Sequence, residues 1–190
     1  MTDKLQEFYK LVEDQGKTWD RHENAFPGQT WKYHLKPVID NAVRFALARG
    51  GDVHVVEIAA LFHDYAGLVD FEKYEAIHHI ASGDLAEPLL RDAGYSQEFI
   101  DKVKKCIFAH RGRVLKEKKS VEEECVADAD AVAHIENVFQ IIMWMGQSGR
   151  SIEDGNEFVK GKITRDFVKL SDAGKDYIRD KYEAILKILY

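Results

Sequence analysis

Residues 53–64 read VHVVEIAALFHD, and this stretch decides the fold. Its apolar side chains follow one another too continuously for a helix with one wet face, so we expect a helix buried in the centre of the molecule. Asp52 directly precedes the run and is a favourable residue at a helix N-cap. The run ends on a histidine and an aspartate, His63 and Asp64, although an acidic side chain is disfavoured at the C-terminal end of a helix dipole.

The sequence on either side of this stretch predicts further helices and no convincing strand. Gly50-Gly51 supplies a stop for the preceding helix, Ser96 can cap a helix that runs through Ala109, and Ser120 with Glu123 has the spacing of a capping box. The fold class is therefore all-α. Helices are expected over 3–14, 30–49, 53–64, about 73–93, 96–109, 120 to about 145, and about 172–189, with loops over 17–30 and 148–156.

Composition limits the class of protein. A chain of 190 residues with 45% hydrophobic residues is expected to form one domain, 1–190. A net charge of -6 argues against a nucleic-acid polymer as partner, because such binding depends on clustered Lys and Arg. The first ten residues, MTDKLQEFYK, lack the apolar core of a signal peptide, and no run approaches a membrane span. We therefore expect a cytoplasmic protein with no membrane partner and two buried free thiols, Cys106 and Cys125.

The histidines and aspartates gather where the predicted helices begin or end. Side chains at the ends of separate helices can converge on one point, which is how helical bundles build metal sites. Imidazole and carboxylate ligands suit Mn, Fe, Co, Ni or Zn, with Mg less favoured, and they leave positions open for water and substrate, as a catalytic site requires. The residues concerned are His34, His63, Asp64, the pair His78-His79, His110 and Asp130.

Five segments together resemble the HD superfamily of metal-dependent phosphohydrolases. They are KYHLKPVIDNAVRFA (32–46), VHVVEIAALFHDYAG (53–67), HHIASGDLAEPLL (78–90), IFAHRG (107–112) and VADADAVAHI (126–135). The resemblance covers about 31–140 and extends more loosely to the C-terminal helix. It implies a compact HD-domain bundle of about six to eight helices in which His34, His63, Asp64 and Asp130 hold a divalent metal.

The resemblance leaves several assignments open. Asp128 is the rival of Asp130, but on a helix the two lie about 200° apart and cannot both face the site; Asp130 is preferred from its local context, and Asp128 is expected to cap a helix or face solvent. In members with two ions, His78 and His110 would bind the second ion, with His79 as the rival of His78. If that ion is absent, they would contact substrate phosphate or transfer protons.

Some neighbouring residues are weaker candidates for the site. Arg111 and Arg113 flank His110, and guanidinium groups bind phosphate oxygens in pairs, so either is a candidate for holding substrate. Glu57 could be a general base or a partly exposed helix residue. His134 lies one turn after Asp130, but such a pair is as often a local helix contact, so we do not place it in the site.

The sequence thus predicts hydrolysis of a phosphate ester or phosphoanhydride in a small nucleotide, with one or two ions drawn from Mn, Co, Ni, Fe, Zn or Mg. The deoxynucleotidase branch usually has a glutamate three residues after its HD aspartate, whereas Gly67 stands there in this chain. Two other functions remain open: a non-catalytic nucleotide-binding or metal-sensing module, and a di-iron oxygenase built from the same ligand types. A homodimer is also possible.

Overall fold

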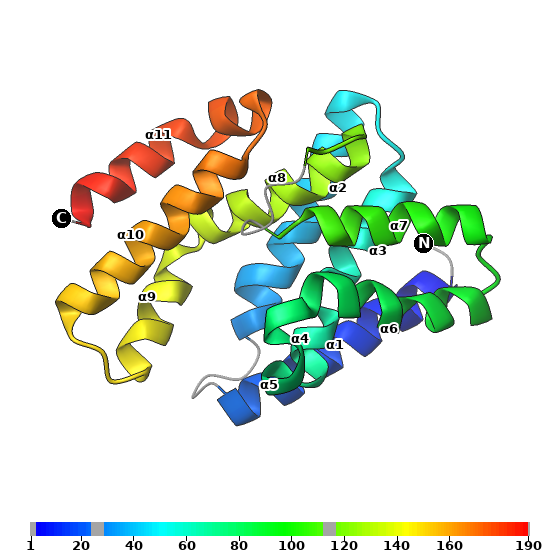
Figure 1. Ribbon diagram of the computed structural model, residues 1–190, viewed down its shortest axis with the longest axis horizontal. Coiled ribbons are helices and arrows are strands. Elements are labelled where there is room, and N and C mark those ends of the chain that lie inside the picture. The colour runs from blue at the N-terminus through cyan, green and yellow to red at the C-terminus, as the bar shows by residue number, and fades with distance from the viewer. Residues whose placement is uncertain (1–2, 24–28, 112–116, 190) are drawn as a thin grey trace.

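The computed structural model describes residues 3–23, 29–111 and 117–189, and within them the fold is all-α, as the sequence predicts (Figure 1). Nine α-helices have ten residues or more and two are shorter, which is slightly more than the six to eight expected. Their bounds are α1 Asp3–Glu23, α2 Lys36–Arg49, α3 Val53–Phe62, α4 Tyr65–Val69, α5 Phe71–Tyr74, α6 His78–Asp92, α7 Gln97–Ala109, α8 Val121–Glu136, α9 Val138–Gln147, α10 Ile152–Lys169 and α11 Asp172–Ile188. A π-helical turn, Trp31–Leu35, precedes α2, and a 3-10 turn, Glu75–Ile77, precedes α6.

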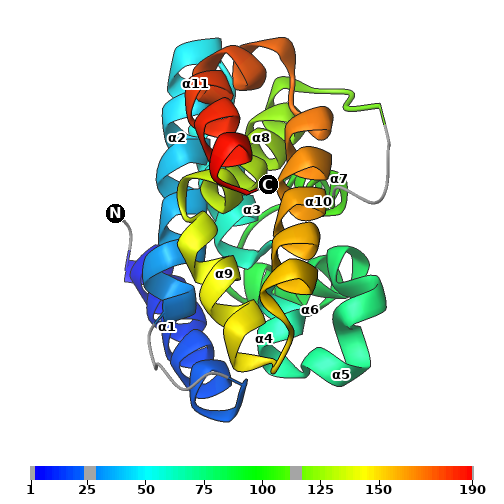
Figure 2. The ribbon, with the colours of Figure 1, turned by 90° about the vertical axis from the view of Figure 1, so that its left-hand side faces the viewer.

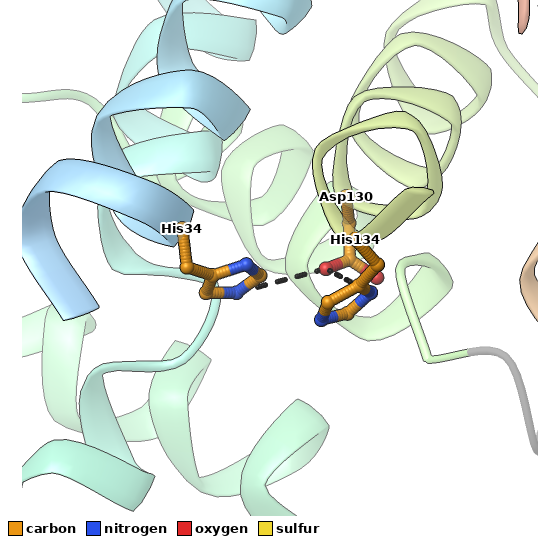
Figure 3. Close-up of side chains that lie close together, drawn as sticks. All are labelled: His34, Asp130 and His134. Atoms are coloured by element: carbon orange, nitrogen blue, oxygen red, sulfur yellow. Dashed lines mark ion pairs between the residues drawn. The ribbon is translucent and has the colours of Figure 1, made fainter. Parts of the chain in front are cut away.

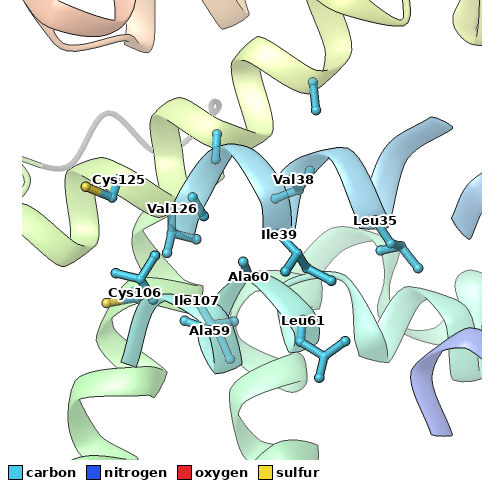
Figure 4. Close-up of a cluster of buried hydrophobic side chains, with 14 of the residues drawn as sticks. Leu35, Val38, Ile39, Ala59, Ala60, Leu61, Cys106, Ile107, Cys125 and Val126 are labelled. Carbon is cyan, nitrogen blue, oxygen red and sulfur yellow. The ribbon is translucent and has the colours of Figure 1, made fainter. Parts of the chain in front are cut away.

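Helix α3 is the centre of the core. Seven of its ten residues are buried, and Val55 and Leu61 are fully inaccessible to solvent. Figure 4 shows Ala59 and Ala60 beneath α2, with Ala59 beside Ile107 of α7. Truncating a side chain such as Leu61 to alanine in a core of this kind costs about 2–5 kcal/mol. This packing fixes the end of α3, and therefore the position of the residues that follow it.

The predicted helix caps are present. Asp52 accepts hydrogen bonds from the backbone N–H groups of His54 and Val55, at 3.0 and 3.2 Å. The hydroxyl of Ser120 accepts from the N–H of Glu123, whose carboxylate in turn accepts from the N–H of Lys119. These bonds satisfy backbone donors that a helix N-terminus otherwise leaves unpaired.

Several predicted boundaries were wrong. α1 continues to Glu23 through most of a segment expected to be a loop, and α6 begins only at His78. The helix expected from 120 to 145 ends at Glu136, and a new helix begins at Val138. The expected loop 148–156 instead contains the start of α10, whose first turn is capped by Ser151 accepting from the N–H of Asp154.

Helices α9, α10 and α11 close one side of the bundle. Figure 2 shows α9 and α10 side by side, and α10 also packs along α8. Asp128 ties α8 to its neighbours: its carboxylate accepts from Arg49 of α2 at 2.7 Å and from the backbone N–H of Ser171, at the start of α11, at 2.9 Å. A Cβ at Gly174 would lie 2.8 Å from this carboxylate, which explains the glycine.

The expectation that Asp128 caps a helix or faces solvent was therefore wrong. The side chain is 1% exposed and joins three helices in the interior.

Among the described residues, no helix is both long enough and apolar enough to cross a membrane.

Candidate metal centre

Four of the predicted side chains meet at one point. His34 lies in the π-helical turn, His63 and Asp64 directly follow α3, and Asp130 lies in α8. The Nε2 atom of His34 is 3.1 Å from Nε2 of His63 and 3.1 Å from Oδ2 of Asp64. Oδ1 of Asp130 lies 3.8 Å from His34 and 3.9 Å from His63.

These separations suit ligands of a single ion. Nitrogen and oxygen ligands about 2.1 Å from an ion and at right angles to one another lie about 3 Å apart. Nε2 of His34, Nε2 of His63 and Oδ2 of Asp64 lie 3.1 to 3.3 Å from one another, and Oδ1 of Asp130 lies 3.8 and 3.9 Å from the two nitrogens. Modest movements would bring them to a common ion.

A second group lies beside the first and shares Asp64 with it. Oδ1 of Asp64 is 3.6 Å from Nε2 of His78 and 3.5 Å from Nε2 of His110, and these two histidine nitrogens are 3.3 Å apart. Oδ2 of Asp64 faces His34 and His63. One carboxylate thus presents one oxygen to each group, which is how a carboxylate bridges two ions.

The histidines are held in the orientation that metal ligation requires. In His63, His78 and His110, Nδ1 lies within hydrogen-bond distance of the backbone carbonyl three residues earlier, at 2.7, 2.9 and 2.5 Å. A carbonyl only accepts, so Nδ1 carries a proton, and in the neutral ring that binds a metal Nε2 has the free lone pair. Metal-binding histidines are fixed in this way, with the second ring nitrogen donating to an oxygen.

Burial and charge set the protonation of the group. Burial favours the neutral form of Asp64, but His63 and the other histidines around it hold its pKa well below the ordinary value. Burial likewise opposes the charge on Asp130, and Lys169 with nearby histidines holds that pKa low. Burial lowers the pKa of His34 to about 4, whereas for His63 the two carboxylates outweigh burial and raise the pKa to about 9. Both carboxylates are therefore ionised and ready to bind a cation.

Sequence reasoning missed two residues beside Asp130. The ring of His134 stacks on that of His34, with centroids 4.6 Å apart, and its Nδ1 is 3.5 Å from Oδ1 of Asp130 (Figure 3). Lys169, the last residue of α10, donates to Oδ2 of Asp130 at 2.6 Å. The i,i+4 spacing of His134 was a usable signal; Lys169 had none, because 148–156 was expected to be a loop and no helix was predicted between it and residue 172.

His79 does not enter the second group. Its Nδ1 lies 3.1 Å from Nη1 of Arg111, and its ring packs on Phe108. Arg111 also donates to the carbonyl of Ala76, and it lines the same cavity as the candidate metal ligands. Arg113 lies outside the described residues.

Glu57 and the tyrosine that follows the His63-Asp64 pair make contacts outside the two ligand groups. Glu57, considered as a general base, accepts a hydrogen bond from the hydroxyl of Tyr9 at 2.7 Å. Tyr65 packs edge-on against Phe62 in the core, with ring centroids 5.5 Å apart.

The two groups face one cavity of about 360 Å³. Two edge-on aromatic pairs, Trp19 with Phe71 and Trp144 with Phe158, contribute to its walls. Cations line it as well, among them Arg165 of α10. Apolar walls with a few converging polar groups are typical of a site for a small molecule.

Comparison with known proteins identifies the family. A family model described as HD domain matches residues 32–148. The chain belongs to the HD domain family. The resemblance seen in the sequence is therefore confirmed, and the match spans the segments that carry His34 through His134. No curated protein matches the chain.

Solved structures share the fold of this HD domain protein. Bacillus subtilis YpgQ in complex with ADP is 21% identical, with 97% of this chain and 93% of that chain covered and a TM-score of 0.67. An HD-superfamily hydrolase from Bacillus thuringiensis is 19% identical, with 97% and 94% covered and a TM-score of 0.66. A predicted HD superfamily hydrolase from an uncultured Thermotogales bacterium is 22% identical, with 84% and 85% covered and a TM-score of 0.58.

Proposed function

We propose that this HD domain protein is a metal-dependent phosphohydrolase that cleaves a phosphate ester or phosphoanhydride of a small nucleotide. The observation that carries the proposal is the position of Asp64 between two groups of histidines, with one carboxylate oxygen facing each. His34, His63, Asp64 and Asp130 would hold one ion, and Asp64, His78 and His110 a second. A divalent ion held there activates water and neutralises charge on a phosphoryl oxygen.

The chain's own residues have separate tasks in this proposal. The backbone carbonyls that accept from Nδ1 of His63, His78 and His110 keep the three rings in place without using Nε2. Arg111, which lines the cavity, would bind a phosphate oxygen of the substrate. The aromatic walls offer flat surfaces to a heterocyclic base.

Two further observations support a nucleotide as the substrate. The cavity volume of about 360 Å³ is within the range of sites for small molecules and cofactors. A solved structure with the same fold, that of YpgQ, contains ADP. Gly67, which lines this cavity, stands where the deoxynucleotidase branch usually carries its glutamate, and this difference argues against that branch.

The proposal is tested with a panel of nucleoside mono-, di- and triphosphates, dinucleotides and cyclic dinucleotides, each assayed with Mn, Co, Ni and Mg. Phosphate and pyrophosphate are measured separately, so that ester and anhydride cleavage are distinguished. We expect metal-dependent release of one of them, loss of activity with a chelator, and loss in Asp64→Asn. No release from any member of the panel would contradict the proposal, and substrate-dependent consumption of oxygen by the iron-loaded protein would replace it with the oxygenase function.

A further inference from the structure

Lys169 is a buried lysine whose ammonium group faces the metal centre. The residue is 6% exposed, and Nζ donates to Oδ2 of Asp130 at 2.6 Å and to the backbone carbonyl of His110 at 2.8 Å. Oδ1 of Asp166 lies 3.7 Å away. A buried ammonium is costly unless its charge is paired and its protons have acceptors; here two carboxylates lie close to Nζ and two acceptors are within hydrogen-bond distance.

The contact divides the two oxygens of Asp130. Oδ2 is taken by Lys169, whereas Oδ1 lies 3.8 and 3.9 Å from Nε2 of His34 and of His63. Lys169 therefore holds the carboxylate so that a single oxygen faces the ligand group. Helix α10, which carries Lys169, lies beyond residues 32–148 that the family model matches.

Lys169 also compensates charge before any ion binds. The centre brings two carboxylates together, those of Asp64 and Asp130, each close to His34. An ammonium 2.6 Å from one of them stabilises the metal-free protein. The same ammonium repels a cation that binds on the other side of that carboxylate.

We propose that Lys169 is a positioning residue and internal counter-ion of the metal centre: it restricts Asp130 to one ligand oxygen and weakens metal binding, so that the metal-free site remains formed. The inference rests on the proposed metal centre. Its consequence is that removing the lysine charge tightens metal binding, which is the opposite of what loss of a merely structural residue would do.

The test compares the metal affinity of folded variants. Wild type, Lys169→Met and Lys169→Gln are stripped of metal, checked for folding by circular dichroism, and titrated with Mn²⁺ in competition with a chelating dye. We expect both variants to bind Mn²⁺ at least about tenfold more tightly, since even a partly screened charge a few ångströms from the ion contributes more than about 1.4 kcal/mol. The glutamine variant keeps a hydrogen-bond donor for Asp130, so it provides the test if the methionine variant does not fold.

Lys162→Met is the matched control. Lys162 is also on α10 and lines the cavity, but its ammonium pairs with Asp166 at 2.9 Å and contacts His134 at 3.0 Å, without touching a carboxylate ligand. Its effect on Mn²⁺ affinity should stay below about threefold, because 28% of the Lys162 side chain is open to solvent, which screens its charge, and the ammonium is paired with Asp166.

The outcomes separate this inference from the proposed function. Wild type that binds no Mn²⁺ would refute the metal centre itself. Wild type that binds Mn²⁺ while Lys169→Gln, folded, binds it equally or more weakly would overturn the role of Lys169 and leave the metal centre standing. The inference is supported if the thermal unfolding midpoint of a Lys169 variant is lower than that of wild type in chelator but equals that of wild type with Mn²⁺.

Discussion

Replacing Asp128 and Asp130 separately by asparagine distinguishes a structural aspartate from the aspartate that we propose as a metal ligand in the same helix. Asp128 is 1% exposed and its carboxylate accepts from Arg49 and from the N–H and hydroxyl of Ser171. Asparagine keeps the shape but loses the charge, and its amide group brings a donor into a site filled with donors. We therefore expect Asp128→Asn to lower stability by about 3 kcal/mol, the scale of a lost charge-assisted bond plus an unpaired buried ion.

The assay is thermal unfolding with and without metal. For a chain of this length, about 3 kcal/mol corresponds to a fall of roughly 6–12 °C in Tm. An ion present at one hundred times its Kd should raise Tm, because it stabilises the folded state by about 2.7 kcal/mol. That rise should be retained in Asp128→Asn, which leaves the ligands in place, and lost in Asp130→Asn.

Loss of the metal-induced rise in Asp128→Asn, with the rise retained in Asp130→Asn, would refute the choice between the two aspartates. A fall in Tm of less than about 2 °C in Asp128→Asn would contradict the stability argument, since it would correspond to only about 1 kcal/mol or less.

Three further predictions concern other parts of the chain. His110→Ala should reduce the ions bound per chain from two to one by mass spectrometry, because His110 lies in the second ligand group only; two retained ions would contradict that grouping. Cys106 and Cys125 are at most 1% exposed, and burial raises the pKa of both thiols, that of Cys125 to about 11. Neither thiol should therefore react with an aromatic disulfide reagent at pH 8 until the protein is unfolded. Rapid reaction of the native protein would contradict their burial. Burial alone would raise the pKa of Asp166, but Lys162 and other nearby cations lower this pKa below its ordinary value. The ionised carboxylate therefore stabilises the fold at neutral pH. This stabilisation is lost as the pH falls below about 4, the pKa of an aspartate in the unfolded chain. Urea unfolding of Asp166→Asn should therefore show a stability deficit at pH 7 that narrows towards pH 3, and a deficit independent of pH would refute the assignment.

Local patterns were enough to predict the centre of the fold. The continuous apolar run before His63 can be buried only inside the bundle, and the histidine and aspartate at its end are then necessarily placed beside the core. The caps at Ser96 and Ser120 were predictable because they depend on hydrogen bonds within four residues.

The rest depends on contacts between distant segments. Asp128 was misjudged because its partners, Arg49 and Ser171, come from two other helices and only the fold brings them together. Lys169 lies 39 residues from Asp130, and nothing in the local sequence marks it as part of the site. The start of α10 was assigned to a loop because its first turn is polar and contains Gly155, whereas packing on α9 and α8 stabilises it.

The most direct test of the central claim is the metal content of His63→Ala compared with wild type and with His54→Ala. His54 is a matched control, since it is bound to the hydroxyl of Tyr95 at 3.0 Å and takes no part in the centre. Each protein is stripped, loaded with Mn²⁺, desalted and measured by mass spectrometry of the metal. We expect wild type and His54→Ala to hold the same number of ions and His63→Ala to lose at least one ion per chain. Full occupancy in His63→Ala would contradict the assignment of this group as a metal centre.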